Sequence, residues 1–148
     1  MALSAACEAA WPSGTRADEQ SALKALKALT ALGAEIARDE TRPGKPVVRV
    51  DLTSRKVKDS DLAHLKEIPS LEIVQLAFTP VTDAGLAHLS SLSNLQVLVL
   101  WQTGVTDRGL PHLKGLKKLA TLNVNETKVT ARGAAELKKS LPKLEVIR

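Results

Sequence analysis

The sequence has very few aromatic side chains and a single cysteine. Only Trp11, Phe78 and Trp101 are aromatic among the 148 residues, and tyrosine is absent. A folded core must therefore consist of Leu, Val, Ile and Ala side chains. Because Cys7 is the only cysteine, an internal disulfide framework and a multi-cysteine zinc site are both excluded.

Long apolar runs and catalytic motifs are missing as well. No apolar run approaches the roughly 18 residues that a membrane-spanning helix needs. The sequence contains no G-x-S-x-G, no H-E-x-x-H and no phosphate-binding G-x-x-x-x-G-K-[ST]. Because 44% of the residues are hydrophobic and 25% are charged, the chain can still bury a core and stay in solution. We therefore expect a folded, non-catalytic protein without a cofactor, a metal site or a membrane span.

The first 17 residues follow no pattern of a folded segment. Small residues lead up to Cys7, as at the end of a secretory or lipoprotein signal, but no basic region precedes them. Residues 12–14 are Pro-Ser-Gly, which interrupts helices. We expect residues 1–17 to be a disordered tail or a signal remnant. The compartment is cytoplasmic by default, and the protein is exported or a lipoprotein if this segment is a truncated signal.

A 24-residue repeat dominates the rest of the sequence. Three full copies occupy residues 57–80, 81–104 and 105–128, and a degenerate copy occupies 129–148. Each copy begins with valine, continues with apolar residues at steps of three, and closes with L-x-x-[VL]-x-[LV], followed in the full copies by x-x-T. Steps of three are typical of a helical turn, and alternation at two residues is typical of a strand with one buried face. Each copy is thus predicted to be a short helix and a strand, and stacking them buries a ladder of leucines.

These copies resemble the leucine-rich-repeat family. They are most similar to the bacterial V-T-D-A-G-L-x-x-L type, which is related to the cysteine-containing repeats found beside F-box domains. The resemblance is strong over residues 57–148 and reaches back to about residue 20. It implies an α/β solenoid, a curved right-handed superhelix with a parallel sheet on its concave face and short helices on its convex face. It implies no particular activity, since the family mostly serves as binding scaffolds.

The residues before the repeat fit an N-terminal cap. Residues 18–46 are predicted to be a capping helix, from about Asp18 to Arg38, followed by a turn rich in proline and glycine. Val47-x-x-Val50-x-Leu52 lies 24 residues before the matching run of the first full copy, so it is predicted to be the first strand. The solenoid then spans residues 47–148, with units near 47–56, 57–80, 81–104, 105–128 and 129–148.

Some positions depart from the repeat. Asp61 stands where the later copies have glycine, and Ala131 stands where the earlier copies have aspartate. The last copy also has one extra residue between Leu137 and Leu141. The last strand can be a degenerate end that nearby lysines keep soluble, or an exposed edge that pairs with another chain. We expect a monomer, with edge pairing as the alternative.

Polar residues recur on the helical part of each copy. Thr82 and Asp83, like their equivalents one copy later, are expected to supply the N-cap oxygen of a helix. His64, His88 and His112 recur once per copy and should form a column with a spacing of about 5 Å. Because one column of equally spaced rings seldom converges on one ion, we do not expect it to bind a metal.

The outward-facing strand positions carry the candidate site. In the middle copies these positions are mostly apolar, and polar residues border them on both sides. An exposed apolar patch with a polar rim often marks a binding site, and tryptophan is enriched at interface hot spots. We predict that a protein or peptide ligand binds at Ile73, Gln75, Phe78, Val97, Val99, Trp101, Asn123 and Asn125. The alternative is that Trp101 lies flat over Ala77 and Phe78 and only covers the sheet.

The charge distribution supports a second hypothesis. The net charge is −3 over residues 57–104 and +6 over residues 105–148. A basic segment can attract nucleic acid or an anionic surface. However, its lysines are spread over several positions of the repeat, and the sheet lacks the aromatic ladder on which single-strand binders stack bases. Nucleic acid therefore ranks well below a protein or peptide as the partner.

Overall fold

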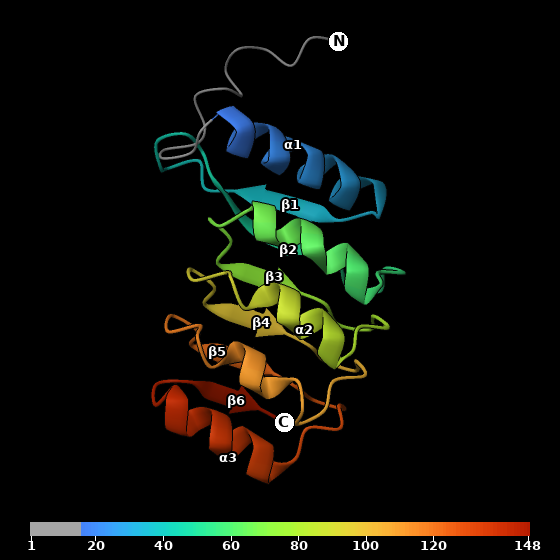
Figure 1. The fold of residues 1–148 in the computed structure, drawn as a ribbon, viewed down its shortest axis with the longest axis vertical. Helices are drawn as coiled ribbons and strands as arrows, with labels where there is room; N and C mark the ends of the chain where they lie inside the picture. Colours follow the sequence, from blue (N-terminus) through green and yellow to red (C-terminus); the bar gives the residue numbers. More distant parts are fainter. Residues whose placement is uncertain (1–15) are drawn as a thin grey trace.

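In the computed structural model, which describes residues 16–148, the strands form one sheet in the order β1 to β6 (Figure 1). The strands are β1 (Glu35–Arg38), β2 (Val47–Asp51), β3 (Ile73–Gln75), β4 (Val97–Val99), β5 (Thr121–Asn123) and β6 (Glu145–Ile147). From β2 to β6 all neighbours are parallel and pair residues 24 apart, as Val50 pairs with Val74 and Val74 with Leu98. The predicted parallel sheet of a leucine-rich-repeat solenoid is therefore confirmed.

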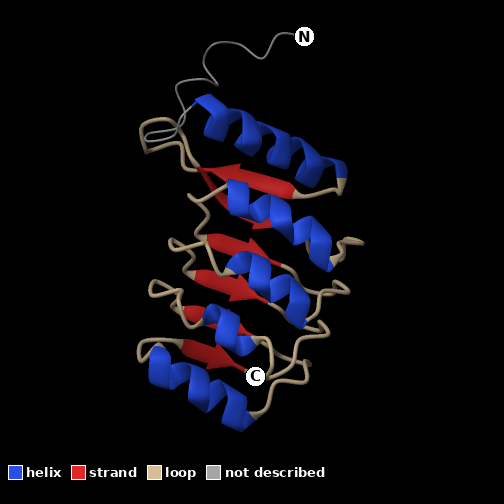
Figure 2. Cartoon of the chain, in the orientation of Figure 1, coloured by secondary structure: helices blue, strands red, loops and turns tan. Residues whose placement is uncertain are grey.

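Each unit from residue 57 onward also contains a short helix. The helices are α1 (Arg16–Ala31), the 3₁₀ helices η2 (Asp59–Glu67) and η3 (Leu110–Leu113), α2 (Asp83–Leu89) and α3 (Ala131–Ser140). Figure 2 shows the helices of the units stacked on one side of the sheet. We call the opposite side, which points away from these helices, the sheet face.

The core lies between the sheet and the helices. In β3, β4 and β5 the central residue is fully buried and its two neighbours are half-buried. Leu62 and Leu86, from successive helices, are likewise fully buried. The core is thus the aliphatic ladder that the repeat predicts, and the residues on either side of each central position belong to the sheet face.

Helix α1 is shorter than the apolar pattern predicts. A helix that continues to Arg38 is wrong, because Gly33 adopts a left-handed backbone with φ of 86° and ends the helix. The N–H of Ala34 donates to the carbonyl of Leu29 (3.0 Å), and the N–H of Gly33 donates to that of Thr30 (2.9 Å). These two hydrogen bonds form a Schellman motif, which glycine allows at little steric cost.

The chain then turns into β1, which is antiparallel to β2 and forms the first edge of the sheet. Ile36, expected on the apolar face of a helix, instead pairs with Val50 and packs against the core from the strand. Helix α1 begins at Arg16, so residues 16 and 17 of the expected tail are helical. The rest of that tail, Cys7 included, lies outside the described residues.

The last unit keeps the 24-residue register despite its extra residue. Leu122 pairs with Val146, so β6 is in register with β5. The N–H of Ala120 donates to the carbonyl of Gln96, but the equivalent bond to Ala120 comes from Glu145, which is 25 residues further on. The residue gained before β6 is therefore lost again at the start of the strand.

Aspartate–threonine pairs join successive units at the start of the helices. Asp59 accepts hydrogen bonds from the N–H (2.7 Å) and the hydroxyl (2.6 Å) of Thr82. The pairs Asp83–Thr106 and Asp107–Thr130 repeat this geometry. The expectation that the Thr82 side chain caps α2 is wrong, because its hydroxyl bonds to the preceding unit instead.

Candidate functional site on the sheet face

The strand register places the predicted strand residues side by side on the sheet face. Ile73 lies beside Val97 on the adjacent strand, and Gln75, Val99 and Asn123 follow one another across three strands. Each of these five side chains is half-buried. They form a continuous surface because each strand turns only its central residue into the core.

The aromatic residues Phe78 and Trp101 form a pair at one edge of this surface. They follow β3 and β4 in adjacent units, and their ring centroids are 4.5 Å apart at an interplanar angle of 60°. Such tilted contacts are a favourable geometry for aromatic pairs. Phe78 is 42% exposed and Trp101 is 37% exposed, whereas the neighbouring Ala77 is buried. The tryptophan ring is thus tilted against phenylalanine and keeps more than a third of its surface in solvent.

The turn that carries Phe78 has an uncommon backbone conformation. Phe78 has φ of 57°, and the same position in the other units, Ser54, Gln102 and Glu126, has φ between 52° and 60°. A left-handed conformation costs a non-glycine residue about 1–2 kcal/mol. The turns are held by ladder hydrogen bonds, as from the N–H of Phe78 to the carbonyl of Trp101 (2.9 Å). The fold therefore imposes this conformation in every unit, and only in one unit does it carry an aromatic ring.

A polar cluster borders the apolar surface on the N-terminal side. The guanidinium of Arg49 donates to the carboxylate of Asp51 (3.0 Å) and to the side-chain oxygen of Gln75 (2.9 Å). Burial raises the pKa of Asp51, but hydrogen bonds from Thr53 and Arg49 outweigh it and lower the pKa below its ordinary value. Gln75, predicted as a contact residue, is thus held by a charged pair. Arg49 and Asp51 were not predicted as site residues, although they occupy the same unit positions as Ile73 and Gln75.

The C-terminal side of the surface is also polar. The side-chain oxygen of Asn123 accepts a hydrogen bond from the backbone N–H of Asn125 (3.0 Å). The same turn occurs two strand positions earlier in the stack, between Asp51 and Thr53. Asn123 therefore has a structural role in addition to any contact with a ligand. Ile147, which pairs with Asn123 and is 38% exposed, extends the surface and was not predicted as a site residue.

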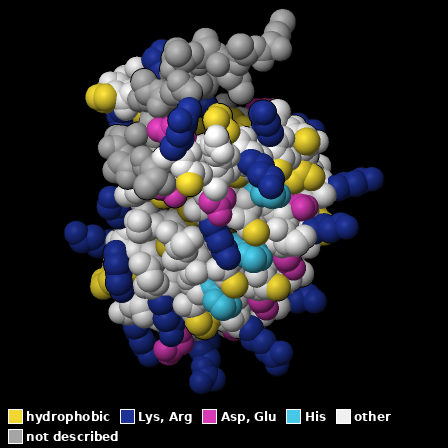
Figure 3. Space-filling model, turned by 45° about the horizontal axis from the view of Figure 1, so that its top comes forward, with side chains coloured by type: hydrophobic (Ala, Val, Ile, Leu, Met, Phe, Trp, Pro, Cys, Tyr) yellow, Lys and Arg dark blue, Asp and Glu magenta, His cyan; other side chains and the backbone are white. Residues whose placement is uncertain are grey.

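The helical side presents histidine and charged side chains instead. Figure 3 shows a row of histidines there, with His64 and His88 half-buried and His112 exposed. Within residues 16–148, no group of three or more His, Cys, Asp or Glu side chains could hold a metal ion. No helix of this described part is both long and apolar enough to span a membrane.

Comparisons with known proteins find likeness at the level of structure. No protein-family model and no curated protein sequence matches the chain. A leucine-rich-repeat protein of Leptospira interrogans aligns with 18% identity and a TM-score of 0.43 over 58% of this chain and 27% of its own. The leucine-rich-repeat ectodomain of the receptor kinase SOBIR1 from Arabidopsis thaliana aligns with 15% identity and a TM-score of 0.44 over 86% and 91%.

An internalin of Listeria monocytogenes aligns with 16% identity and a TM-score of 0.41, over 84% of this chain and 54% of its own. The chain thus spans about a quarter of the Leptospira protein and about half of the internalin. The decisive features are in the chain itself: one parallel strand and one short helix per unit, a 24-residue register and a continuous aliphatic ladder. With these features the chain is a leucine-rich-repeat solenoid.

Proposed function

We propose that this chain is a non-catalytic interaction scaffold that binds a protein or peptide ligand on its sheet face. The observation that carries the proposal is the Phe78–Trp101 pair, two contacting rings of which about two fifths of the surface is exposed. In a chain with so few aromatic residues, the burial of these rings elsewhere in the core would be expected if they served stability alone. Their exposure beside an apolar strand surface is typical of an interface hot spot.

The surroundings of the pair determine how a ligand would be recognised. Ile73, Val97 and Val99 continue the apolar surface from the rings across β3 and β4, so a ligand must bring apolar side chains to this area. The Arg49–Asp51 pair on one side is already neutralised internally, which limits its electrostatic contribution. The proposed mechanism is therefore apolar contact and shape in the centre, with hydrogen bonds at the polar rim setting the orientation.

Affinity capture from the native lysate tests this proposal. The wild-type chain and Trp101→Ala would be immobilised in parallel, with His112→Ala on the helical side as a matched control for an exposed ring. Thermal melting would first show that all three fold. We expect a protein that wild type and the control retain and Trp101→Ala loses. Direct titration of that protein should show binding to Trp101→Ala weakened about 30-fold, as for a hot spot worth about 2 kcal/mol.

Other results would contradict the proposal. If Trp101→Ala retains the same proteins as wild type, the sheet face is not the site. If Trp101→Ala does not fold, the ring belongs to the core and the surface interpretation fails. If all variants mainly retain nucleic acid that salt removes, the basic C-terminal third is the binding region.

A further inference from the structure

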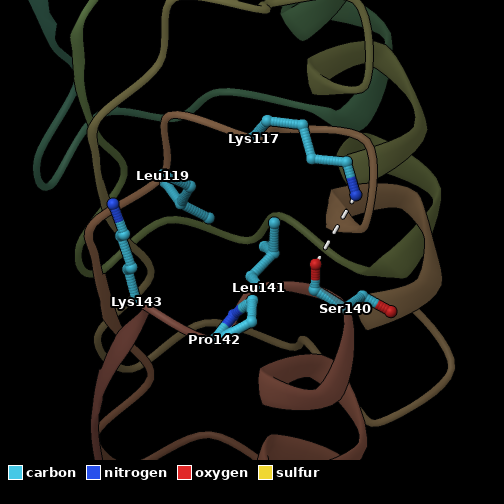
Figure 4. A pocket seen from close by; sticks show the side chains of 6 residues that line it. All are labelled: Lys117, Leu119, Ser140, Leu141, Pro142 and Lys143. Carbon is cyan, nitrogen blue, oxygen red and sulfur yellow. Dashed lines mark hydrogen bonds between the residues drawn. The ribbon is translucent and has the colours of Figure 1, made fainter.

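A pocket lies between the last two units, where the helices lead into the strands (Figure 4). Its volume is about 280 Å³, and its lining consists of Lys117, Leu119, Ser140, Leu141, Pro142 and Lys143. The side chains of Leu119 and Leu141 are almost fully buried and form an apolar floor, whereas both lysines are exposed at the rim. The pocket therefore combines an aliphatic base with two ammonium groups.

The local sequence explains why only this interface is hollow. At the two preceding interfaces a short polar side chain bridges the units: the hydroxyl of Ser70 donates to the carbonyl of Val47 (2.7 Å), and the amide of Asn94 donates to that of Pro69 (3.0 Å). The next equivalent residue is Lys118, whose ammonium donates back to the side chain of Asn94 (2.7 Å). The extra residue before Leu141 lengthens α3 at the same place, and the space stays open.

One weak polar contact crosses the opening. The ammonium of Lys117 lies 3.5 Å from the carbonyl of Ser140, at the limit of a hydrogen bond (Figure 4). This long side chain can turn toward a ligand without loss of a strong interaction. The pocket is smaller than the sites of about 300–1,000 Å³ that enclose drug-sized ligands. Its size fits one or two side chains of a larger partner.

The surroundings of the pocket are strongly basic. Within the described part of the chain, none of the five ion pairs includes Lys117, Lys118 or Lys143. The nearby carboxylate of Glu136 is already paired with Lys139 (2.7 Å). Its pKa is lowered, first by this hydrogen bond and then by further positive charges, among them Lys114. A partner that supplies carboxylates would therefore meet uncompensated positive charge.

We propose that this pocket binds an acidic peptide segment of a partner protein, with an aliphatic side chain on the leucine floor and carboxylates on Lys117 and Lys143. The chemistry of the lining favours a peptide over a nucleic acid. Bases bind through aromatic stacking or bidentate arginine contacts, and the lining contains neither aromatic nor arginine side chains. A leucine floor instead matches an aliphatic group. This surface is separate from the Phe78–Trp101 pair and does not depend on it.

A phage-displayed library of random dodecamers, selected on the purified chain, tests the proposal. We expect enriched peptides in which Asp or Glu flanks Leu, Ile or Val. The variant Lys117→Glu/Lys143→Glu should bind these synthetic peptides at least tenfold more weakly. The matched control Lys58→Glu/Lys66→Glu has the same change in net charge at exposed lysines of the first full unit and should bind like wild type. Replacing the aliphatic residue of the peptide by glycine should cause a similar loss.

A measurement on the unaltered protein keeps the test independent of variant folding. Titration of the ¹⁵N-labelled wild-type chain with an enriched peptide should shift amide signals of residues 117–119 and 140–143. The proposal is overturned if the shifts lie elsewhere, if the enriched peptides lack acidic residues, or if both double variants lose binding equally. It is also overturned, in favour of nucleic acid, if a 20-nucleotide oligo-dT binds more tightly than the peptides and displaces them.

Discussion

The interface between the middle units and the interface at the first unit satisfy the same backbone group in different ways. In the middle, the carboxylate of Asp83 accepts the N–H of Thr106 from the following unit. Gly109 leaves room for that carboxylate, because a Cβ there would lie 2.5 Å from its oxygen. In the first full unit the equivalent N–H belongs to Lys58, and Asp61 of the same unit accepts it (2.8 Å). Asp61 stands where Gly109 stands in its unit, and it needs no space for a preceding aspartate.

The last unit shows the opposite half of the same rule. Gly133 is retained because the carboxylate of Asp107 occupies the space beside it. Ala131 replaces the aspartate, and it faces no following threonine. In this solenoid the glycine thus depends on the preceding unit and the aspartate on the following unit. Departures from the repeat are therefore informative, because each one marks a neighbour that differs.

The largest expected effect separates the middle of the core from its end. Leu98 is fully buried in β4, so Leu98→Ala should lower the free energy of unfolding by about 2–5 kcal/mol. Val146 occupies the equivalent position in β6 but is only half-buried, so Val146→Ala should cost about 1 kcal/mol. Urea unfolding followed by circular dichroism measures both. Equal losses would contradict the difference between middle and end.

The glycine rule predicts a somewhat smaller effect. Gly109→Ala should destabilise the fold by about 1–3 kcal/mol, because the added methyl group meets Asp83 and Leu86. Gly115→Ala is the matched control, since no atom lies within 4 Å of its added Cβ. It should leave the unfolding midpoint unchanged or slightly raise it. If both variants lose the same stability, backbone conformation and not space determines the choice of glycine.

Most of the fold could be predicted from the sequence because the repeat states the same pattern several times. The period located strands β2 to β6, and the alternation within each copy identified their buried residues. Strand β1 has no equivalent in the repeat, and Ile36 continues the apolar steps of α1 beyond Gly33. Apolar spacing alone therefore could not distinguish a longer helix from a strand.

The site was predictable in its columns and not in its contacts. A period of 24 residues and a side-chain period of two are sufficient to place Ile73 beside Val97. The contact between the Phe78 and Trp101 rings depends on a left-handed turn that no glycine signals. The pocket at Lys117 depends on one residue gained before β6 and lost again at its start. Both features arise from local backbone geometry, which composition and spacing do not determine.

The turn conformation supports a prediction of about 1 kcal/mol. Phe78→Ala and Phe78→Gly both remove the ring, but only glycine relieves the left-handed conformation at φ of 57°. Phe78→Gly should therefore be more stable than Phe78→Ala by about 1 kcal/mol. Ser54 has the same conformation in the first turn, so Ser54→Gly compared with Ser54→Ala should show a similar gap. Chemical denaturation measures both pairs, and the absence of a gap in either would show that its turn is unstrained.

The smallest expected effect concerns the last aspartate–threonine pair and its dependence on pH. Hydrogen bonds from Thr130 lower the pKa of Asp107 below its ordinary value of 3.8. Because the folded-state pKa is lower than the unfolded-state value, the ionised carboxylate contributes stability above about pH 3.8. That contribution is lost as the pH falls through the lower pKa of the folded state. The effect is small because the carboxylate is exposed and screened by salt.

Asp107→Asn removes the charge and keeps a side-chain oxygen that can accept one hydrogen bond. The variant should be less stable than wild type at pH 7, and the difference should shrink as the pH falls below about 3.8. Glu126→Gln removes the same charge outside the aspartate–threonine pairs and controls for the change in net charge. Urea unfolding at pH values from 2.5 to 7 would follow the three proteins. A difference for Asp107→Asn that stays constant over this range would show that Thr130 is bound equally well by the protonated carboxyl group, and the last interface would then depend on geometry and not on charge.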